Sequence, residues 1–261
     1  MKNLNLTVIG YILPNLEDDM IIGHLDSFGK NFWENVETNI VISKKISDKL
    51  AKAFAKYGIN YTDGVEEYWI PTVLSLVESC KTKYVEVLLE DKLVTDEEKF
   101  IHSLQTLDKS NLDFMPSHYT KYWNTLAEWL GKYTDIVVDD DFTIIGWGTK
   151  YSVFSRKNNF RECIEGLQGD PFPVVAGGIY KTKLLLKLLE RVLASRYWNE
   201  ICTHGPNYFT DWAKNPKLPH SFEVWWKHND ETEPLDYTVL VPKDIHSIAN
   251  DPKNNERWHL E

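Results

Sequence analysis

The chain has 261 residues, of which 43% are hydrophobic, so it can form one large α/β domain or two small ones with a substantial core. The 39 acidic residues outnumber the 29 basic ones, and the net charge of -10 argues against nucleic acid as a partner. The cysteines are widely spaced, without a metal-binding pattern, as in reduced cytoplasmic proteins. We find no secretory leader and no apolar stretch long enough to span a bilayer, so we expect a soluble, cytoplasmic protein, although peripheral membrane contact is compatible with the sequence.

The first 80 residues alternate between strand and helix patterns. In chain order we predict a strand at 4–13, a helix at 18–32, a strand at 39–43, a helix at about 48–57, a strand at 59–62 and a helix at about 71–80. Gly58 is a typical residue to end a helix, and Pro71 stands in a first helical turn, where proline is tolerated. This alternation predicts a parallel sheet with right-handed crossovers.

Residues 83–92 are the most informative stretch of the chain. An apolar run rich in valine and leucine ends abruptly at Glu90 and Asp91, as expected for a buried strand of a parallel sheet. Ligands of open α/β sheets bind outside the carboxyl ends of the strands. Two carboxylates at that edge can hold a divalent cation, which in turn can bind a diphosphate. The alternative is a pair of solvated acids that begin a loop, with Lys92 as their ion-pair partner.

The second half of the chain has weaker patterns. The predicted elements are a capped helix beginning at 95–98, strands at 134–138 and 143–147, a glycine-containing segment at 174–180 that leads into a helix at about 182–197, and a strand at 237–241. We find no internal repeat and no clear linker, so we expect a single domain over residues 1–261.

Three further segments are candidates for chemistry, and each has a structural alternative. The carboxylates of 139–141 repel one another unless they are solvated in a turn or bind a cation. Gly177 and Gly178 precede a helix, where they allow either close approach of an anion or a tight strand-to-helix turn. Glu223 lies in the aromatic segment 219–226, which is typical either of an acceptor site with a general base or of an edge strand with buried tryptophans.

Several common nucleotide and hydrolase motifs do not occur in the sequence. Neither GxxxxGK[ST] nor GxGxxG is found, which excludes a P-loop and a standard dinucleotide site. A GxSxG elbow is also missing, so an α/β-hydrolase is not expected.

The order of the elements resembles the GT-A class of nucleotide-sugar glycosyltransferases, with a family-2-like layout over about residues 4–228. The resemblance is carried by residues 6–13, 71–80 leading into 84–91, 174–180 with the helix that follows, and 218–226. It implies an α/β fold of the half-Rossmann kind, with a mostly parallel central sheet flanked by helices. About residues 1–107 would form the half that binds the nucleotide-sugar, and about residues 108–261 would form the half that binds the acceptor.

The resemblance also implies a hexosyltransferase that moves a sugar from a nucleotide-diphosphate donor to a glycan or other hydroxyl acceptor, as in polysaccharide biosynthesis. Asp91 and Glu90 would hold Mg²⁺ or Mn²⁺, although Glu90-Asp91-Lys92 departs from the D-x-D pattern of the class and leaves metal dependence open. Donor contacts would also come from Ser43, Lys44, Asp63, Gly64, Gly177 and Gly178.

Glu223 is the candidate base for an inverting displacement, and Asp211 competes with it for that role. If neither serves as a base, the resemblance favours a retaining mechanism instead. Two other classes of protein stay open. A sugar nucleotidyltransferase normally carries a glycine-rich, basic signature after the first strand, which residues 11–15 lack. A non-catalytic carbohydrate-binding or scaffold protein would account for the imperfect acidic motif.

Overall fold

The computed structural model describes residues 4–12, 17–65, 69–88, 92–116, 140–147, 178–194, 235–244 and 247–249. The strands are β1 (Leu6–Ile12), β2 (Glu37–Ile42), β3 (Tyr61–Asp63), β4 (Tyr84–Val87), β5 (Lys92–Val94), β6 (Phe114–Pro116), β7 (Phe142–Trp147), β8 (Gly178–Lys181), β9 (Tyr237–Pro242) and β10 (Ser247–Ala249). The helices are α1 (Asp18–Ser27), α2 (Lys30–Asn35), α3 (Asp48–Tyr57), α4 (Trp69–Ser79), α5 (Glu97–Lys109) and α8 (Thr182–Ala194).

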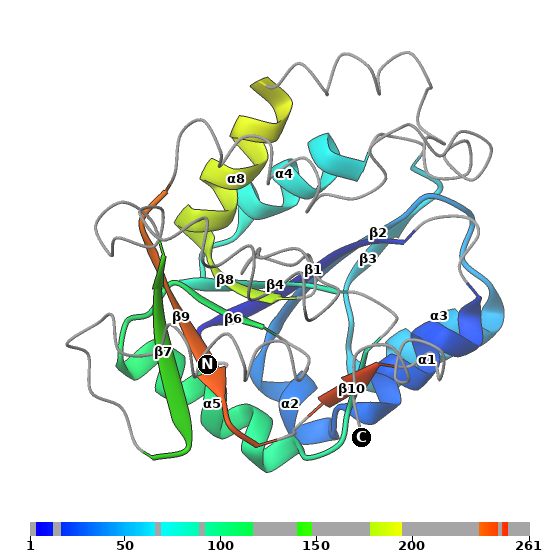
Figure 1. Cartoon of the computed structure of the whole chain (residues 1–261). Coiled ribbons are helices and arrows are strands. Elements are labelled where there is room, and N and C mark those ends of the chain that lie inside the picture. Colours follow the sequence, from blue (N-terminus) through cyan, green and yellow to red (C-terminus); the bar gives the residue numbers. More distant parts are fainter. Residues whose placement is uncertain are drawn as a thin grey trace, which may run out of the picture.

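A large sheet forms the middle layer of the fold. Its eight strands have the order β3-β2-β1-β4-β8-β6-β9-β7, and a separate two-stranded sheet joins β10 to β5. Helices α4 and α8 lie on one face of the large sheet, and α1, α2, α3 and α5 lie on the other (Figure 1). The predicted fold class, α/β with a mostly parallel sheet flanked by helices, is confirmed.

The parallel half of the sheet is built around β1. This strand pairs in parallel with β2 on one side and with β4 on the other, and β2 pairs in parallel with β3. The chain therefore moves outward from β1 to β3 and then returns to the opposite side of β1, which creates a topological switch point between β1 and β4. All seven residues of β1 are buried, because helices cover both faces of a sheet of this kind.

The other half of the sheet is mixed in direction. Strand β8 is antiparallel to both β4 and β6, whereas β9 is parallel to β6 and antiparallel to β7. Because β8 runs opposite to β4, its first residue, Gly178, lies toward the carboxyl end of β4. The predicted strands at 143–147 and 237–241 are confirmed as β7 and β9. The predicted strand at 134–138 and the segment 219–226 lie outside the described residues.

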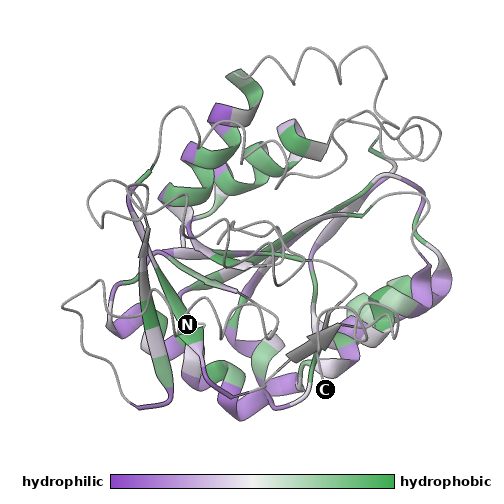
Figure 2. Cartoon of the chain, in the orientation of Figure 1, coloured by the Kyte–Doolittle hydropathy of each residue, from purple (hydrophilic) through white to green (hydrophobic). Residues whose placement is uncertain are grey.

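The helices that cover the sheet differ in polarity. Figure 2 shows α4 as largely apolar, whereas α8 and α5 each carry polar side chains as well as apolar ones. In α8 the leucines recur at helical spacing and four of them are buried, namely Leu184, Leu185, Leu188 and Leu189. Within the described ranges, no helix has the length and apolar character needed to cross a bilayer.

Helix ends in the first half follow the local signals in the sequence. The Ser47 hydroxyl accepts a hydrogen bond from the Leu50 N–H at the start of α3, and Gly58 ends that helix with a φ of 66°. The Asp96 carboxylate caps α5 in the same way by accepting from the Lys99 N–H. These contacts are local, which is why the sequence predicts them.

The single helix predicted at 18–32 is wrong, since α1 and α2 are separated at Phe28 and Gly29. The reason is a contact from a distant part of the chain. The Glu97 carboxylate accepts a hydrogen bond from the Phe32 N–H at 2.8 Å, and a Cβ on Gly29 would lie 2.1 Å from Glu97 Oε2. A carboxylate is stabilising at a helix N-terminus, so Glu97 starts a new helix at this point.

Cys80, the cysteine within the described residues, is a free and partly buried thiol. Burial raises its pKa to about 11, so it is protonated at neutral pH. Cys163 and Cys202 lie outside the described residues.

Candidate functional site

The carboxyl edge of the sheet, where β1, β2, β3 and β4 end, is the candidate site. These strands are parallel, so the segments that follow them meet at one edge. Four of the predicted donor-binding residues lie at this edge. Ser43 and Lys44 directly follow β2, Asp63 is the last residue of β3, and Gly64 follows it. The structure brings these four together.

Backbone contacts join the ends of β1, β2 and β3. The N–H and the hydroxyl of Ser43 both donate to the carbonyl oxygen of Ile12, each at 2.9 Å. The Gly64 N–H donates to the Lys44 carbonyl at 3.2 Å. The φ of Gly64 is 75°, in the left-handed region that favours glycine. The segment that leaves β2 is therefore fixed to both neighbouring strands.

Asp63 holds this segment from one side. Its Oδ2 accepts a hydrogen bond from the Ile46 N–H at 2.9 Å and lies 3.1 Å from Lys45 Nζ. The Ile46 N–H, and then the Lys45 ammonium, lower the pKa of the Asp63 carboxyl. Asp63 therefore positions this segment, and its direct contact with a donor stays a prediction.

Asp18 holds the same segment from the other side. Its carboxylate accepts a hydrogen bond from the Ser47 hydroxyl, and its Oδ1 lies 3.7 Å from Lys44 Nζ. The side chain of Lys44 is 32% exposed, so its ammonium can also be reached by an anion at the edge. We predicted Asp18 only as a helix start, because its partners lie 26 and 29 residues further along the chain.

The switch point between β1 and β4 lies next to this segment. The Leu88 N–H donates to the Ile9 carbonyl at 2.7 Å, so the pairing of β4 with β1 continues to Leu88. Glu90 and Asp91 follow within three residues, before β5 begins. Several predicted site residues lie outside the described ranges, namely Glu90, Asp91, Gly177, Asp211, Glu223 and Asp139 of the acidic cluster. Among the described residues, no three His, Cys, Asp or Glu side chains gather closely enough to hold a metal ion.

Gly178 lies at the same edge and is buried in the sheet. It pairs with Pro116 of β6 and stands one residue beyond the Glu86–Ile179 pair of β4 and β8. A Cβ at this position would lie only 2.0 Å from Cε2 of Phe114, whose ring is fully buried. Packing against Phe114 therefore explains the glycine, and its predicted contact with a donor stays a prediction.

We expect Gly178→Ala to destabilise the protein by about 1–3 kcal/mol, because the added methyl group overpacks the core. Urea unfolding of the variant checks the value. Phe114→Leu removes the atoms that clash, so the double variant should lose less stability than the sum of the two single variants. Purely additive losses would contradict the packing explanation.

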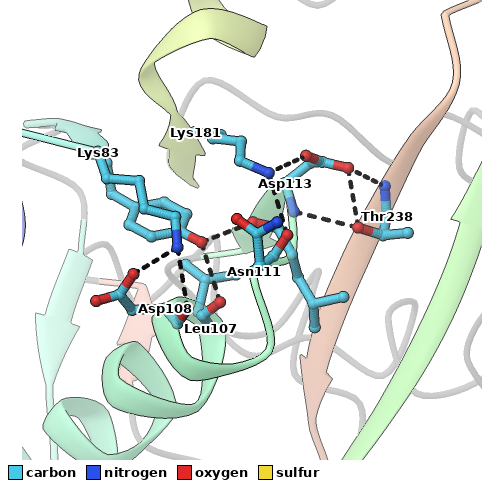
Figure 3. Close-up of polar contacts among 9 residues, drawn as sticks. Lys83, Leu107, Asp108, Asn111, Asp113, Lys181 and Thr238 are labelled. Atoms are coloured by element: carbon cyan, nitrogen blue, oxygen red, sulfur yellow. Dashed lines mark hydrogen bonds and ion pairs between the residues drawn. The ribbon is translucent and has the colours of Figure 1, made fainter. Parts of the chain in front are cut away.

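A second polar cluster lies at the opposite edge of the sheet and is structural (Figure 3). Lys83 Nζ lies 2.6 Å from Asp108 Oδ1, and Lys181 Nζ lies 2.9 Å from Asp113 Oδ1. The remaining oxygen of Asp113 accepts from both the N–H and the hydroxyl of Thr238 at 2.9 Å. These contacts connect α5, β8 and β9 beside the start of β4.

The chain was compared with known proteins. No protein-family model matches it, and neither does any curated protein. It is similar in structure to S. aureus TarS 1–349, with a TM-score of 0.46, 13% identity, and coverage of 95% of this chain and 61% of that one. For 4-diphosphocytidyl-2C-methyl-D-erythritol synthase from Anaerococcus prevotii the TM-score is 0.48, the identity 14%, and the coverage 95% and 92%.

A further similar structure is glucosyl-3-phosphoglycerate synthase from Mycobacterium tuberculosis, in complex with Mn²⁺, UDP and glucosyl-3-phosphoglycerate. Its TM-score is 0.39, its identity 11%, and the match covers 70% of this chain and 58% of that one. The chain spans 36% of the longer TarS structure.

Proposed function

We propose that this chain is a glycosyltransferase that moves a sugar from a nucleotide-diphosphate donor to a hydroxyl acceptor. The observation that carries the proposal is the switch point between β1 and β4, where ligands of open α/β sheets bind. In the sequence, the acidic pair Glu90 and Asp91 follows β4 after two leucines. The cationic Lys44 lies on the segment that leaves β2, at the same edge.

The segment 43–47 would form the wall of the nucleotide site. Asp18 holds it from one side and Asp63 from the other, so its backbone is already ordered before a ligand binds. Preorganisation of this kind reduces the entropy lost on binding. The Lys44 ammonium would balance part of the negative charge of the diphosphate.

The acidic pair would hold a divalent cation. Its two carboxylates are hard oxygen ligands of the kind that suits Mg²⁺ or Mn²⁺, and the β1–β4 pairing up to Leu88 supports their place at the sheet edge. When bound, such a cation neutralises negative charge on the diphosphate leaving group. Asp91, with Glu90, is the residue that we assign to this role.

The acceptor half would supply the base. In the inverting reaction, the Glu223 carboxylate takes the proton from the acceptor hydroxyl, whose oxygen forms a bond to the anomeric carbon. The bond from that carbon to the diphosphate oxygen breaks at the same time. Asp211 is the second candidate for this proton transfer.

A thermal-shift screen against UDP-, GDP-, CMP- and dTDP-sugars, with Mn²⁺ or with EDTA, tests the proposal. A donor at 100 times its dissociation constant should add about 2.7 kcal/mol of stability and raise the melting temperature measurably. We expect one nucleotide to stabilise the protein, and to do so only with the metal.

The other outcomes of the screen, together with a turnover assay that includes nucleoside triphosphates, separate the rival functions. A shift that survives EDTA would retain the transferase and remove the metal from the proposal. Stabilisation by a nucleoside triphosphate, with release of pyrophosphate, would indicate a nucleotidyltransferase. A protein that no donor stabilises, and that binds glycans without turnover, would contradict the proposal in favour of a carbohydrate-binding protein.

A further inference from the structure

We propose that a cavity beside the first turns of α8 binds a single phosphate group, at the edge of the sheet opposite to the candidate site. The cavity has a volume of about 130 Å³ and lies between α8, the residue before β6 and the start of β9. Its lining consists of Asp113, Lys181, Lys183, Leu184, Lys187, Leu235, Asp236 and Tyr237. This site is independent of the proposed transferase activity.

The direction of β8 places the cavity away from the carboxyl edge. Lys181 is the last residue of β8, and it pairs with Tyr84, the first residue of β4. The parallel strands β1, β2 and β4 therefore begin at the edge where the cavity lies and end at the opposite one. A ligand in the cavity is separated from the segment 43–47 by the length of these strands.

One lysine and one carboxylate of the lining neutralise each other. Asp113 Oδ1 lies 2.9 Å from Lys181 Nζ, and its Oδ2 accepts hydrogen bonds from the N–H and the hydroxyl of Thr238 (Figure 3). The Lys181 ammonium also donates to the Asn111 carbonyl at 3.1 Å. Both oxygens of Asp113 are therefore occupied, and the pair forms part of the cavity wall.

The charges that remain are those of Lys183, Lys187 and Asp236. Lys183 and Lys187 are exposed and four residues apart on α8, so they project from the same face of the helix and repel each other. Within the described part of the chain, neither ammonium has a hydrogen bond or an ion pair. With three lysines and two aspartates, the lining carries a net charge of +1 (3 − 2), whereas the whole chain carries -10. An anion would relieve the repulsion between the two lysines.

The size and chemistry of the cavity fit one phosphate group. A cavity of about 150 Å³ holds a molecule of the size of benzene, so this cavity has room for a phosphate group and not for a whole nucleotide. Lysine ammonium groups bind phosphate as mobile point charges, and two of them balance its charge of about -1.5 to -2. Leu184 and Leu235 supply apolar surface beside the charges, which strengthens their attraction for the anion.

Titration of ¹⁵N-labelled protein with inorganic phosphate, at constant ionic strength, tests the proposal. We expect saturable changes in the amide chemical shifts of residues 181–187 and 235–237. Lys183→Gln combined with Lys187→Gln should weaken binding at least about tenfold, because the phosphate loses its charge-assisted contacts. Lys187→Arg keeps the positive charge, so it should bind phosphate more tightly than Lys187→Gln does.

The matched control removes two lysines on the other face of the sheet. Lys30 and Lys52 are exposed on α2 and α3, so Lys30→Gln combined with Lys52→Gln changes the net charge by the same amount (Figure 1). This variant should keep the affinity for phosphate. The proposal would be overturned by shifts confined to residues 43–47 and 63–64, by the lack of any saturable shift, or by an equal loss of affinity in the two double variants.

A second pair of measurements identifies the source of the phosphate group. Glycerol 3-phosphate is titrated as a soluble monoester, and vesicles of phosphatidylcholine with or without phosphatidic acid are tested by co-sedimentation. Saturable shifts at 181–187 with the monoester would assign the site to a soluble metabolite. Sedimentation that requires phosphatidic acid, and that is lost in the Lys183→Gln, Lys187→Gln variant, would assign it to a lipid headgroup. Binding of inorganic phosphate without either of these would indicate an adventitious ion only and would contradict the proposal.

Discussion

Asp91→Ala is expected to lower sugar transfer at least about a hundredfold, the effect of removing a group that stabilises charge in a transition state. In the proposed function, Asp91 would hold the cation that neutralises the negative charge gained by the leaving diphosphate. The loss should appear in steady-state release of the nucleotide, measured at saturating donor and over a range of Mn²⁺ concentrations. Asp91→Glu keeps a carboxylate, so it should retain more activity than Asp91→Ala.

The control is a carboxylate outside the site. Glu98 is exposed in the first turn of α5, and Glu98→Ala removes the same charge from the same region of the chain. We expect this variant to keep its activity. Full activity of Asp91→Ala, or an equal loss in both variants, would remove Asp91 from the cation site.

The parallel half of the sheet could be predicted because its signals are local. Strands β1, β2 and β4 are apolar runs, and helix α3 carries its own capping residues, Ser47 and Gly58. Strands β5, β6 and β10 have only three residues each, too few for a pattern, and the sheet pairing that stabilises them connects distant segments. The antiparallel direction of β8 likewise depends on its neighbours.

In the candidate site, too, local features could be predicted and contacts between distant segments could not. The place of Ser43 and Gly64 at this edge could be predicted, because they directly follow strands and parallel strands end at one edge. The role of Asp18 could not, since it depends on a hydroxyl 29 residues away. A weak signal was present, because Asp18 and Asp19 are adjacent carboxylates soon after the first strand.

Phe28→Ala should destabilise the protein by about 3–5 kcal/mol, because it removes a fully buried ring and leaves a cavity. Phe28 lies where α1 and α2 separate, and its ring centroid is 4.3 Å from that of Phe32 and 5.3 Å from those of Trp33 and Phe100. These ring contacts add to the loss from burial. Urea unfolding followed by tryptophan fluorescence measures the change, and the melting temperature should fall by roughly 10 °C.

The loss at Phe28 should also reach β5, which is bonded to the end of α1. Phe28 follows Ser27, whose hydroxyl accepts a hydrogen bond from the Val94 N–H and thereby holds β5. If the rings fix the end of α1, amide exchange at Val94 should speed up in Phe28→Ala under conditions in which the protein stays folded. Phe28→Leu fills most of the cavity, so it should lose less stability and keep the protection of Val94. Normal protection of Val94 in Phe28→Ala would mean that Ser27 holds β5 independently of the aromatic core.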